Sequence, residues 1–459
     1  MKSKLRVSIV LMVVLLVIST VYYFNRPEHS YEAPLPKEAE GKTVVNLWMK
    51  NSNEVETRRN QIERYNLEND DNIYINFVVY GSDYTNMLKV ALSSSRKPDI
   101  FQYGYATLLT KGEIEPLDDF GIDIESAGNK NFLYYNGKPY AATLSANKAK
   151  LLWNKEMFAA AGLDPETPPK TWEEVIAYSE KIKEKFPEVV PFSFPVNDYD
   201  NIKLSIGNPS VGFDSIYHSF WNYEKGQYEF DSAKNILEVY RELYSKGMLD
   251  EKFAEKNRKN IRLDFYRESV AMIIGTYEDN SYFNKTVVAN FEIGVADLPV
   301  FSYGNTSKYY TIGDYKNMVI RKDVENKEAV KKVMEWLMSS DVNRELLITG
   351  DVMPLFLDET DTKNFGENSF YGGASFENAI LDPTLYISYN ANEHKNLIVS
   401  AIDGSMEISD VINKLNDNYK KNYERAVRDS NFNFDFYRVD SSKSAKKGVS
   451  YGYKDIFKK

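Results

Sequence analysis

The fold class is decided by residues 43–103, which read TVVNLWMKNSNEVETRRNQIERYNLENDDNIYINFVVYGSDYTNMLKVALSSSRKPDIFQY. Three runs rich in β-branched and aromatic residues are predicted strands, at residues 44–48, 73–80 and 99–103. Between them, residues 54–69 form a polar-rich helical segment, and apolar side chains recur at helical spacing in residues 84–92. Strands that alternate with helices are typical of a parallel sheet covered by helices, so the sequence predicts an α/β fold.

Helix signals recur farther along the chain. Thr171 and Glu174 form a capping box, which predicts the start of a helix that ends before Pro187. Ser232 is expected to cap a further helix, with Gly247 at its carboxyl end. No repeat period is apparent, so neither a solenoid nor a propeller is expected.

Composition excludes several kinds of chemistry. The 459 residues, 43% of them hydrophobic, suffice for two to four folded domains. The absence of Cys excludes disulfides, thiolate nucleophiles, Cys-ligated metals and a Cys-linked lipid anchor. The three His residues lie far apart, at positions 29, 218 and 394. Because no nucleophile, nucleotide-binding or metal motif occurs either, we expect no catalytic residue, metal site or cofactor.

Charge narrows the choice of partners. The formal net charge is −10, and the basic residues are scattered along the chain instead of clustered. A nucleic-acid partner is therefore not expected, whereas a neutral or cationic ligand is compatible with this surface.

The N-terminal region has the pattern of an export segment. Residues 7–24 are uncharged and mostly apolar, and three basic residues precede them. Residues 1–26 are interpreted as a signal peptide or an uncleaved transmembrane anchor. The bulky residues 21–24 and the lack of an A-x-A cleavage site favour the anchor. The Pro-containing residues 27–42 read as a linker, so in either case the remainder is predicted to be exported.

Aromatic and amide residues suggest a class of ligand. The chain has 34 Tyr, 25 Phe and 5 Trp residues. Aromatic rings can pack against the C–H faces of a sugar, and amide or carboxyl groups can bind its hydroxyls. In open α/β sheets, ligands bind beyond the carboxyl ends of the strands. The candidates at such ends are Lys50, Asn51, Ser52, Gln102, Tyr103, Gly104, Tyr277, Glu278 and Asp279.

Five segments, in this order, resemble the extracellular solute-binding proteins of sugar ABC transporters, the family of maltose-binding-protein-like receptors. They are residues 97–120, 135–175, 271–279, 293–300 and 326–354. The second segment resembles the most diagnostic part of the family, with the triplet Trp153, Asn154 and Lys155 followed by the helix start at Pro169–Trp172. The resemblance covers residues 44–425.

This resemblance implies a two-lobed periplasmic-binding-protein-like fold of type II, whose α/β lobes are joined by hinge strands. The N-terminal lobe would comprise residues 43–145 and 313–348, and the C-terminal lobe residues 146–312 and 349–459. The chain would cross between the lobes near 145–148, 310–314 and 350, and ligand binding would close the hinge.

The resemblance also implies roles for site residues. By position, Gln102 and Tyr103 would donate polar contacts from the N-terminal lobe, and Asn147 would contact a sugar hydroxyl at the hinge. Tyr277 occupies a position where the family commonly has a stacking Trp. The full set of expected ligand-binding residues is Asn51, Gln102, Tyr103, Asn147, Trp221, Tyr277, Asp314 and Tyr315.

The chain departs from the family pattern at two places, and each departure leads to an expectation. Near His394 the family would have a Trp, but this chain has Asn390 and Ala391, and Trp221 is expected to compensate by stacking from the C-terminal lobe. The lipidated Cys of many Gram-positive members is also missing, so the apolar N-terminal helix is expected to be the tether.

The sequence thus predicts a monomeric receptor at the extracellular face of the plasma membrane. It would bind a carbohydrate, expected to be an oligosaccharide, and deliver it to the permease subunits of an ABC transporter. Three alternatives remain open. The same fold could bind a different ligand, either another small solute or ferric iron through Tyr134 with Tyr135 or Tyr309 with Tyr310. It could instead present its ligand to a sensor kinase, or the chain could be an exported hydrolase or lyase.

Overall fold

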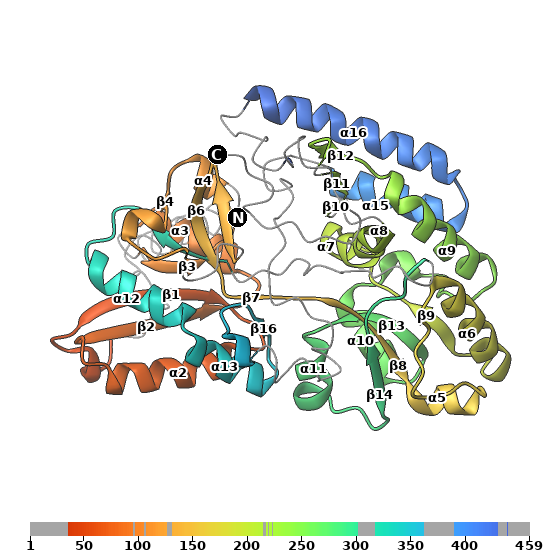
Figure 1. Cartoon of the computed structure of the whole chain (residues 1–459), viewed down its shortest axis with the longest axis horizontal. Helices are drawn as coiled ribbons and strands as arrows, with labels where there is room; N and C mark the ends of the chain where they lie inside the picture. Colours follow the sequence, from red (N-terminus) through yellow and green to blue (C-terminus); the bar gives the residue numbers. More distant parts are fainter. Residues whose placement is uncertain are drawn as a thin grey trace, which may run out of the picture. The chain divides into compact units, whose positions relative to one another are not determined.

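A computed structural model describes most of the chain (Figure 1). The described residues are 35–94, 97–104, 107–125, 131–213, 217–218, 220–222, 224–301, 317–361, 390–429 and 438. The chain divides into a short unit, residues 1–42, and a large unit, residues 43–459. The predicted N-terminal helix lies outside the described residues, and η1 (Lys37–Ala39) is the first described element. Within the described ranges, every helix is too short or too polar to cross a membrane.

The larger sheet has seven strands in the order β2-β1-β3-β15-β6-β5, and β4 also pairs with β15. The strands are β1 (Thr43–Lys50), β2 (Ile73–Tyr80), β3 (Ile100–Gln102), β4 (Ile114–Glu115), β5 (Phe132–Tyr135), β6 (Lys138–Thr143) and β15 (Asn317–Arg321). The first three are parallel, as predicted, whereas β15 runs antiparallel to β3 and β6. This confirms the α/β alternation.

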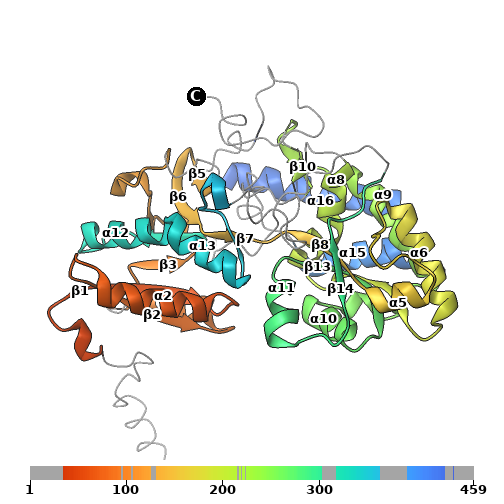
Figure 2. The ribbon, with the colours of Figure 1, turned by 60° about the horizontal axis from the view of Figure 1, so that its bottom comes forward.

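Helices cover both faces of this sheet. Side chains alternate along β1, so Leu47 packs with one cluster and Trp48 with the other. The Leu47 face is covered by α2 (Val55–Glu68) and α12 (Lys327–Met338), which leads into α13 (Ser340–Thr349), as Figure 2 shows. The Trp48 face is covered by α3 (Tyr84–Leu92) and α4 (Thr107–Thr110).

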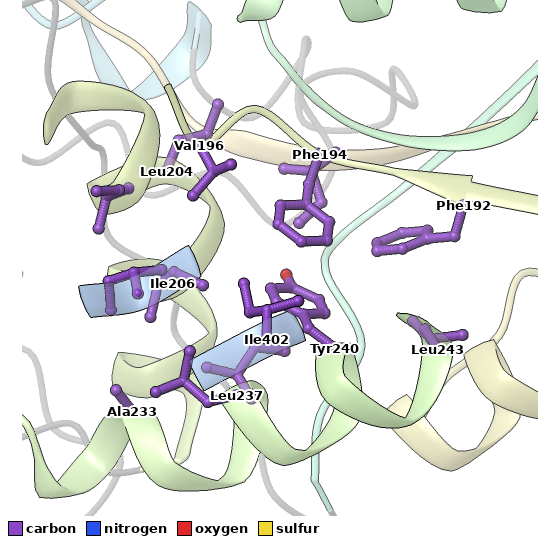
Figure 3. Packing of buried hydrophobic residues seen from close by; sticks show 14 of the residues in the cluster. Phe192, Phe194, Val196, Leu204, Ile206, Ala233, Leu237, Tyr240, Leu243 and Ile402 are labelled. Carbon is purple, nitrogen blue, oxygen red and sulfur yellow. The ribbon is translucent and has the colours of Figure 1, made fainter. Parts of the chain in front are cut away.

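The smaller sheet has four strands in the order β14-β8-β13-β9. They are β8 (Ala149–Asn154), β9 (Val190–Ser193), β13 (Val270–Thr276) and β14 (Ile293–Ala296). The surrounding helices are α5 (Lys155–Ala160), α6 (Trp172–Lys185), α9 (Lys234–Ser245), α10 (Arg258–Tyr266), α15 (Ala391–Asp403) and α16 (Ile408–Asp429). Figure 3 shows part of this core, where the Phe194 and Tyr240 rings stack with centroids 3.9 Å apart.

Short elements complete the described chain. They are η2 (Asp118–Phe120), α7 (Tyr199–Ile202), η3 (Lys203–Gly207), α8 (Asn208–Phe213), β10 (Tyr217–His218), β11 (Trp221–Asn222), β12 (Gln227–Tyr228), η4 (Asp231–Ala233), η5 (Phe253–Glu255), α11 (Asp279–Ser281) and η6 (Tyr282–Thr286).

Two short strands lie between the sheets. β7 (Ser145–Ala146) follows β6 of the larger sheet almost directly, and β8 of the smaller sheet begins three residues after β7 ends. β7 pairs antiparallel with β16 (Met353–Pro354), which lies just after α13. These strands are where hinge strands were expected, and Figure 1 shows β7 running between the two sheets.

The helix-end predictions had mixed outcomes. The capping box of Thr171 and Glu174 is present at the start of α6, as predicted. Gly247 follows α9 with a left-handed φ of 67°, also as predicted. Ser232 was wrongly expected to cap α9. It lies inside η4, whose last residue continues into α9 with helical dihedral angles, so no extended cap position exists there.

Candidate ligand-binding site

The first half of the site lies at the carboxyl ends of β1 and β3. Gln102 ends β3 and is 8% exposed. Its Oε1 accepts a hydrogen bond from the backbone N–H of Lys50 (3.1 Å), and its carbonyl accepts one from the hydroxyl of Tyr84 (2.5 Å). Asn51, which follows β1, is exposed, and its N–H donates to the Tyr80 carbonyl (2.7 Å). Two expected residues, Gln102 and Asn51, therefore lie at adjacent strand ends.

Aromatic rings lie beside these strand ends. The centroids of Trp48 and Tyr80 are 4.9 Å apart, and Tyr80 is the last residue of β2. Tyr103, directly after β3, packs half-buried against the same cluster, and its N–H donates to the Asn317 carbonyl (2.7 Å). The indole Nε1 of Trp48 is buried without a hydrogen-bond partner in the described part of the chain.

The second half of the site lies where β8 begins and β13 ends. Asn147, between β7 and β8, is 3% exposed. Neither its Nδ2 nor its Oδ1 has a hydrogen-bond partner among the described residues. A buried amide without partners is costly by about 1–3 kcal/mol, so such a group is an exception that needs an explanation. Next to it, the carbonyl of Lys148 accepts a hydrogen bond from the N–H of Tyr277 (3.0 Å).

The two halves meet through their loops. The side-chain Nδ2 of Asn53, in the loop after β1, donates to the carbonyl of Glu278, in the turn after β13 (3.5 Å). The Glu278 carboxylate is itself held by Arg258 (3.0 Å), whose guanidinium also donates to Thr276 Oγ1 (2.7 Å). The carboxyl ends of strands from both sheets are therefore brought together.

A charged cluster lies at the start of β8. The ammonium groups of Lys148 and Lys150 lie 3.1 and 2.8 Å from Oδ1 of Asp297, which directly follows β14. The lysine side chains are 2% and 1% exposed, whereas that of Asp297 is 38% exposed. Burial alone would raise the pKa of Asp297, but the two ammonium groups outweigh it and hold this pKa below its ordinary value. Desolvation lowers the pKa of Lys150 by more than Asp297 raises it, because that lysine is far less exposed.

Two expected residues, Trp221 and Tyr277, have buried rings, and two others are not described by the structure. Trp221 is fully buried between Tyr228 and Tyr423, with centroids 5.1 and 5.9 Å away, so neither face of its ring is open to a ligand. The ring of Tyr277 is also fully buried, although its backbone adjoins Lys148. Asp314 and Tyr315 lie outside the described residues, as do Tyr309 and Tyr310.

The described tyrosine pair does not suit ferric iron. Tyr134 and Tyr135 are neighbours in β5, so their side chains point to opposite faces of the sheet. Tyr134 packs against the cluster that contains Leu47, and Tyr135 packs against the cluster that contains Trp48. Two phenolates placed in this way cannot bind one ion.

Sequence reasoning missed Trp48, Tyr80, Lys148 and Lys150. Tyr80 ends a predicted strand, so the rule that selected Gln102 could have found it. Trp48 ends the predicted strand 44–48, but the observed strand continues to Lys50 and Trp48 is buried within it. The two lysines carry no such signal, because Lys is usually exposed and their burial depends on Asp297, more than 140 residues away.

Comparison with known proteins places the chain among binding proteins. The sequence profile for bacterial extracellular solute-binding proteins matches residues 51–344. The sn-glycerol-3-phosphate-binding periplasmic protein UgpB of Shigella flexneri serotype 5b is 26% identical over 290 residues. That alignment covers 57% of this chain and 62% of the length of UgpB.

Solved structures share the fold. The sugar-binding protein MalE from Xanthomonas citri superposes with a TM-score of 0.65 at 16% identity, covering 84% of this chain and 99% of MalE. The cyclic alpha-maltosyl-1,6-maltose binding protein from Arthrobacter globiformis gives 0.63 at 17% identity, covering 85% of this chain and all of that one. These similarities confirm the two-lobed α/β fold that the sequence predicted.

Proposed function

Since this chain belongs to the bacterial extracellular solute-binding proteins, we propose that it binds a carbohydrate between the two sets of strand ends and delivers it to an ABC permease. The observation that carries this proposal is Asn147, whose buried amide has both a donor and an acceptor without partners in the described chain. A sugar hydroxyl can accept from the Nδ2 and donate to the Oδ1. The role is that of a receptor without catalytic activity.

The aromatic residues support the choice of a carbohydrate. Tyr80 and Tyr103, which are both partly exposed, lie at the same strand ends as the polar Gln102, and rings beside amides suit the alternating apolar and hydroxyl surfaces of a pyranose. The names of structural relatives such as the cyclic alpha-maltosyl-1,6-maltose binding protein point in the same direction.

A thermal-shift screen against mono- and oligosaccharides tests the proposal. A sugar at 100 times its Kd should add about 2.7 kcal/mol to the free energy of unfolding and raise the midpoint. Asn147→Ala should weaken the binding of that sugar about tenfold, because two buried hydrogen bonds are lost. The exposed Asn86→Ala is the control and should bind like the unmodified chain. A panel in which no sugar shifts the midpoint contradicts the proposal.

A phosphorylated polyol is a second candidate ligand. It is favoured by Lys148 and Lys150, which follow Asn147 closely in sequence, because their two positive charges exceed the single negative charge of their shared partner Asp297 and can attract an anionic group. The name of the relative UgpB includes such a ligand, sn-glycerol 3-phosphate. If this candidate is correct, glycerol 3-phosphate stabilises the chain, glycerol does not, and Lys148→Met removes the difference.

We further propose the topology in the cell. Residues 1–26 would remain as an uncleaved anchor, residues 27–42 would act as a spacer, and the folded part would face the cell exterior as a monomer. An intact-mass measurement on the membrane-extracted protein tests the anchor, because cleavage would remove the mass of the apolar segment. Binding to a permease would distinguish transport from presentation to a sensor kinase.

The lobes are proposed to have the boundaries expected from the sequence: residues 43–145 with 313–348, and residues 146–312 with 349–459. The pairing of β7 with β16 supports crossings near residues 145 and 350. Limited proteolysis at those positions, slowed by the ligand, would support these boundaries.

A further inference from the structure

One carboxylate outside the ligand site collects four side-chain donors. Asp351 lies between α13 and β16 and is 3% exposed. Its Oδ2 accepts hydrogen bonds from the hydroxyls of Thr57 and Thr349, both at 2.7 Å. Its Oδ1 accepts one from the ammonium group of Lys285 (2.7 Å) and one from the hydroxyl of Ser281 (3.3 Å).

These donors come from both halves of the molecule. Thr57 is on α2, which packs on the seven-stranded sheet, whereas Ser281 and Lys285 are in α11 and η6, which follow β13 of the four-stranded sheet. A further hydrogen bond joins the same segments, from Asn280 Nδ2 to the Gly350 carbonyl (3.4 Å). Both ribbon views accordingly place α11 next to the end of α13 (Figures 1 and 2).

The geometry restricts rotation of one sheet relative to the other. In the described chain, β7 and β16 supply a ladder of only two residue pairs between the sheets. A rotation about these strands would separate Thr57 from Lys285 and leave the buried carboxylate with fewer donors. A hydrogen bond to a charged group contributes more than one between neutral groups, so the arrangement in which all four donors are satisfied is favoured.

We propose that Asp351 is an interlobe latch, with Lys285 as its ionic partner, that sets the angle between the lobes in the absence of ligand. Asp351 and Lys285 thus hold the two lobes in position relative to each other. Neither Asp351 nor Lys285 is among the residues assigned to the ligand site.

Distance measurements between spin labels test this proposal without any ligand, so their result is independent of the proposed function. The chain has no Cys, so the double variant Val90→Cys on α3 and Glu184→Cys on α6 carries one label at each of two exposed positions. Asp351→Asn and Lys285→Met should each displace the mean distance or make its distribution about twice as wide, because the lobes then rotate more freely. The control is Lys332→Met, which removes an exposed ion pair between α12 and Asp71, both beside the larger sheet, and should leave the distribution unchanged.

The outcomes are distinct. Unchanged distances in folded Asp351→Asn and Lys285→Met proteins would overturn the latch. If Asp351→Asn does not fold, Lys285→Met and Thr57→Val decide, because the Lys285 side chain is 48% exposed and its loss is tolerable for folding. A change in Lys332→Met equal to that in Lys285→Met would also overturn the proposal, since it would show a general effect of lost charge.

Discussion

His394 is an ionisable residue enclosed by aromatic rings. The rings of Tyr199 and Phe230 meet it edge-on at 5.3 Å, and its Nδ1 lies 2.8 Å from the hydroxyl of Tyr419. Desolvation lowers its pKa to about 3. The folded chain therefore keeps this imidazole neutral over the pH range in which an exposed histidine becomes charged.

This burial predicts acid sensitivity. Between pH 6.5 and about 3 the unfolded chain binds a proton at position 394 and the folded chain does not, so stability falls as the pH falls. The slope from this one group is at most about 1.4 kcal/mol per pH unit. Urea unfolding at a series of pH values should therefore show a shallower slope for His394→Phe than for the unmodified chain. Equal slopes would mean that position 394 does not titrate in this way.

At the scale of elements, α6 begins with a complete capping box. The Thr171 hydroxyl accepts a hydrogen bond from the N–H of Glu174 (3.2 Å), and the Glu174 carboxylate accepts one from the N–H of Thr171 (3.4 Å). Thr171→Ala should lower the free energy of unfolding by about 1 kcal/mol, measured by chemical denaturation. Glu173→Gln in the same helical turn keeps the cap and should cost no more than about 0.5 kcal/mol. Equal losses in both variants would contradict a specific contribution of the cap.

Local sequence patterns predicted the helices and strands better than they predicted which side chains surround a given residue. The strand expected at residues 73–80 and the helix expected at 84–92 have those bounds in the structure, because periodicity and strand composition are local properties. The same local reasoning placed Asn51 and Gln102 at the ends of their strands, which is where they lie, while their role in binding stays a prediction. Trp221 was expected to stack on a ligand but is buried against Tyr423, about 200 residues away. A contact between residues so far apart in sequence leaves no local pattern.

At the scale of the whole molecule, the short pairing of β7 with β16 between the two sheets predicts closure on ligand. A carbohydrate that raises the unfolding midpoint should shorten the distance between labels at Val90 and Glu184. The reason is that contacts with both sets of strand ends favour the arrangement in which those ends are closest. The same sugar added to Asn147→Ala at the same concentration should produce less of the short-distance population. A bound sugar that leaves the distance unchanged would contradict closure.

The position of β15 in the larger sheet also determines when that sheet can be completed. β15 lies between β3 and β6, yet its first residue, Asn317, is 174 positions beyond its partner Thr143. In a chain that emerges N-terminus first, β2-β1-β3 and β6-β5 lack their shared strand until the intervening residues have also emerged. Because the loop-closure entropy of such a non-local pairing must be lost before its contacts form, the final pairing is expected to be slow. The topology thus keeps the chain incompletely folded until late in its passage from synthesis to the native state.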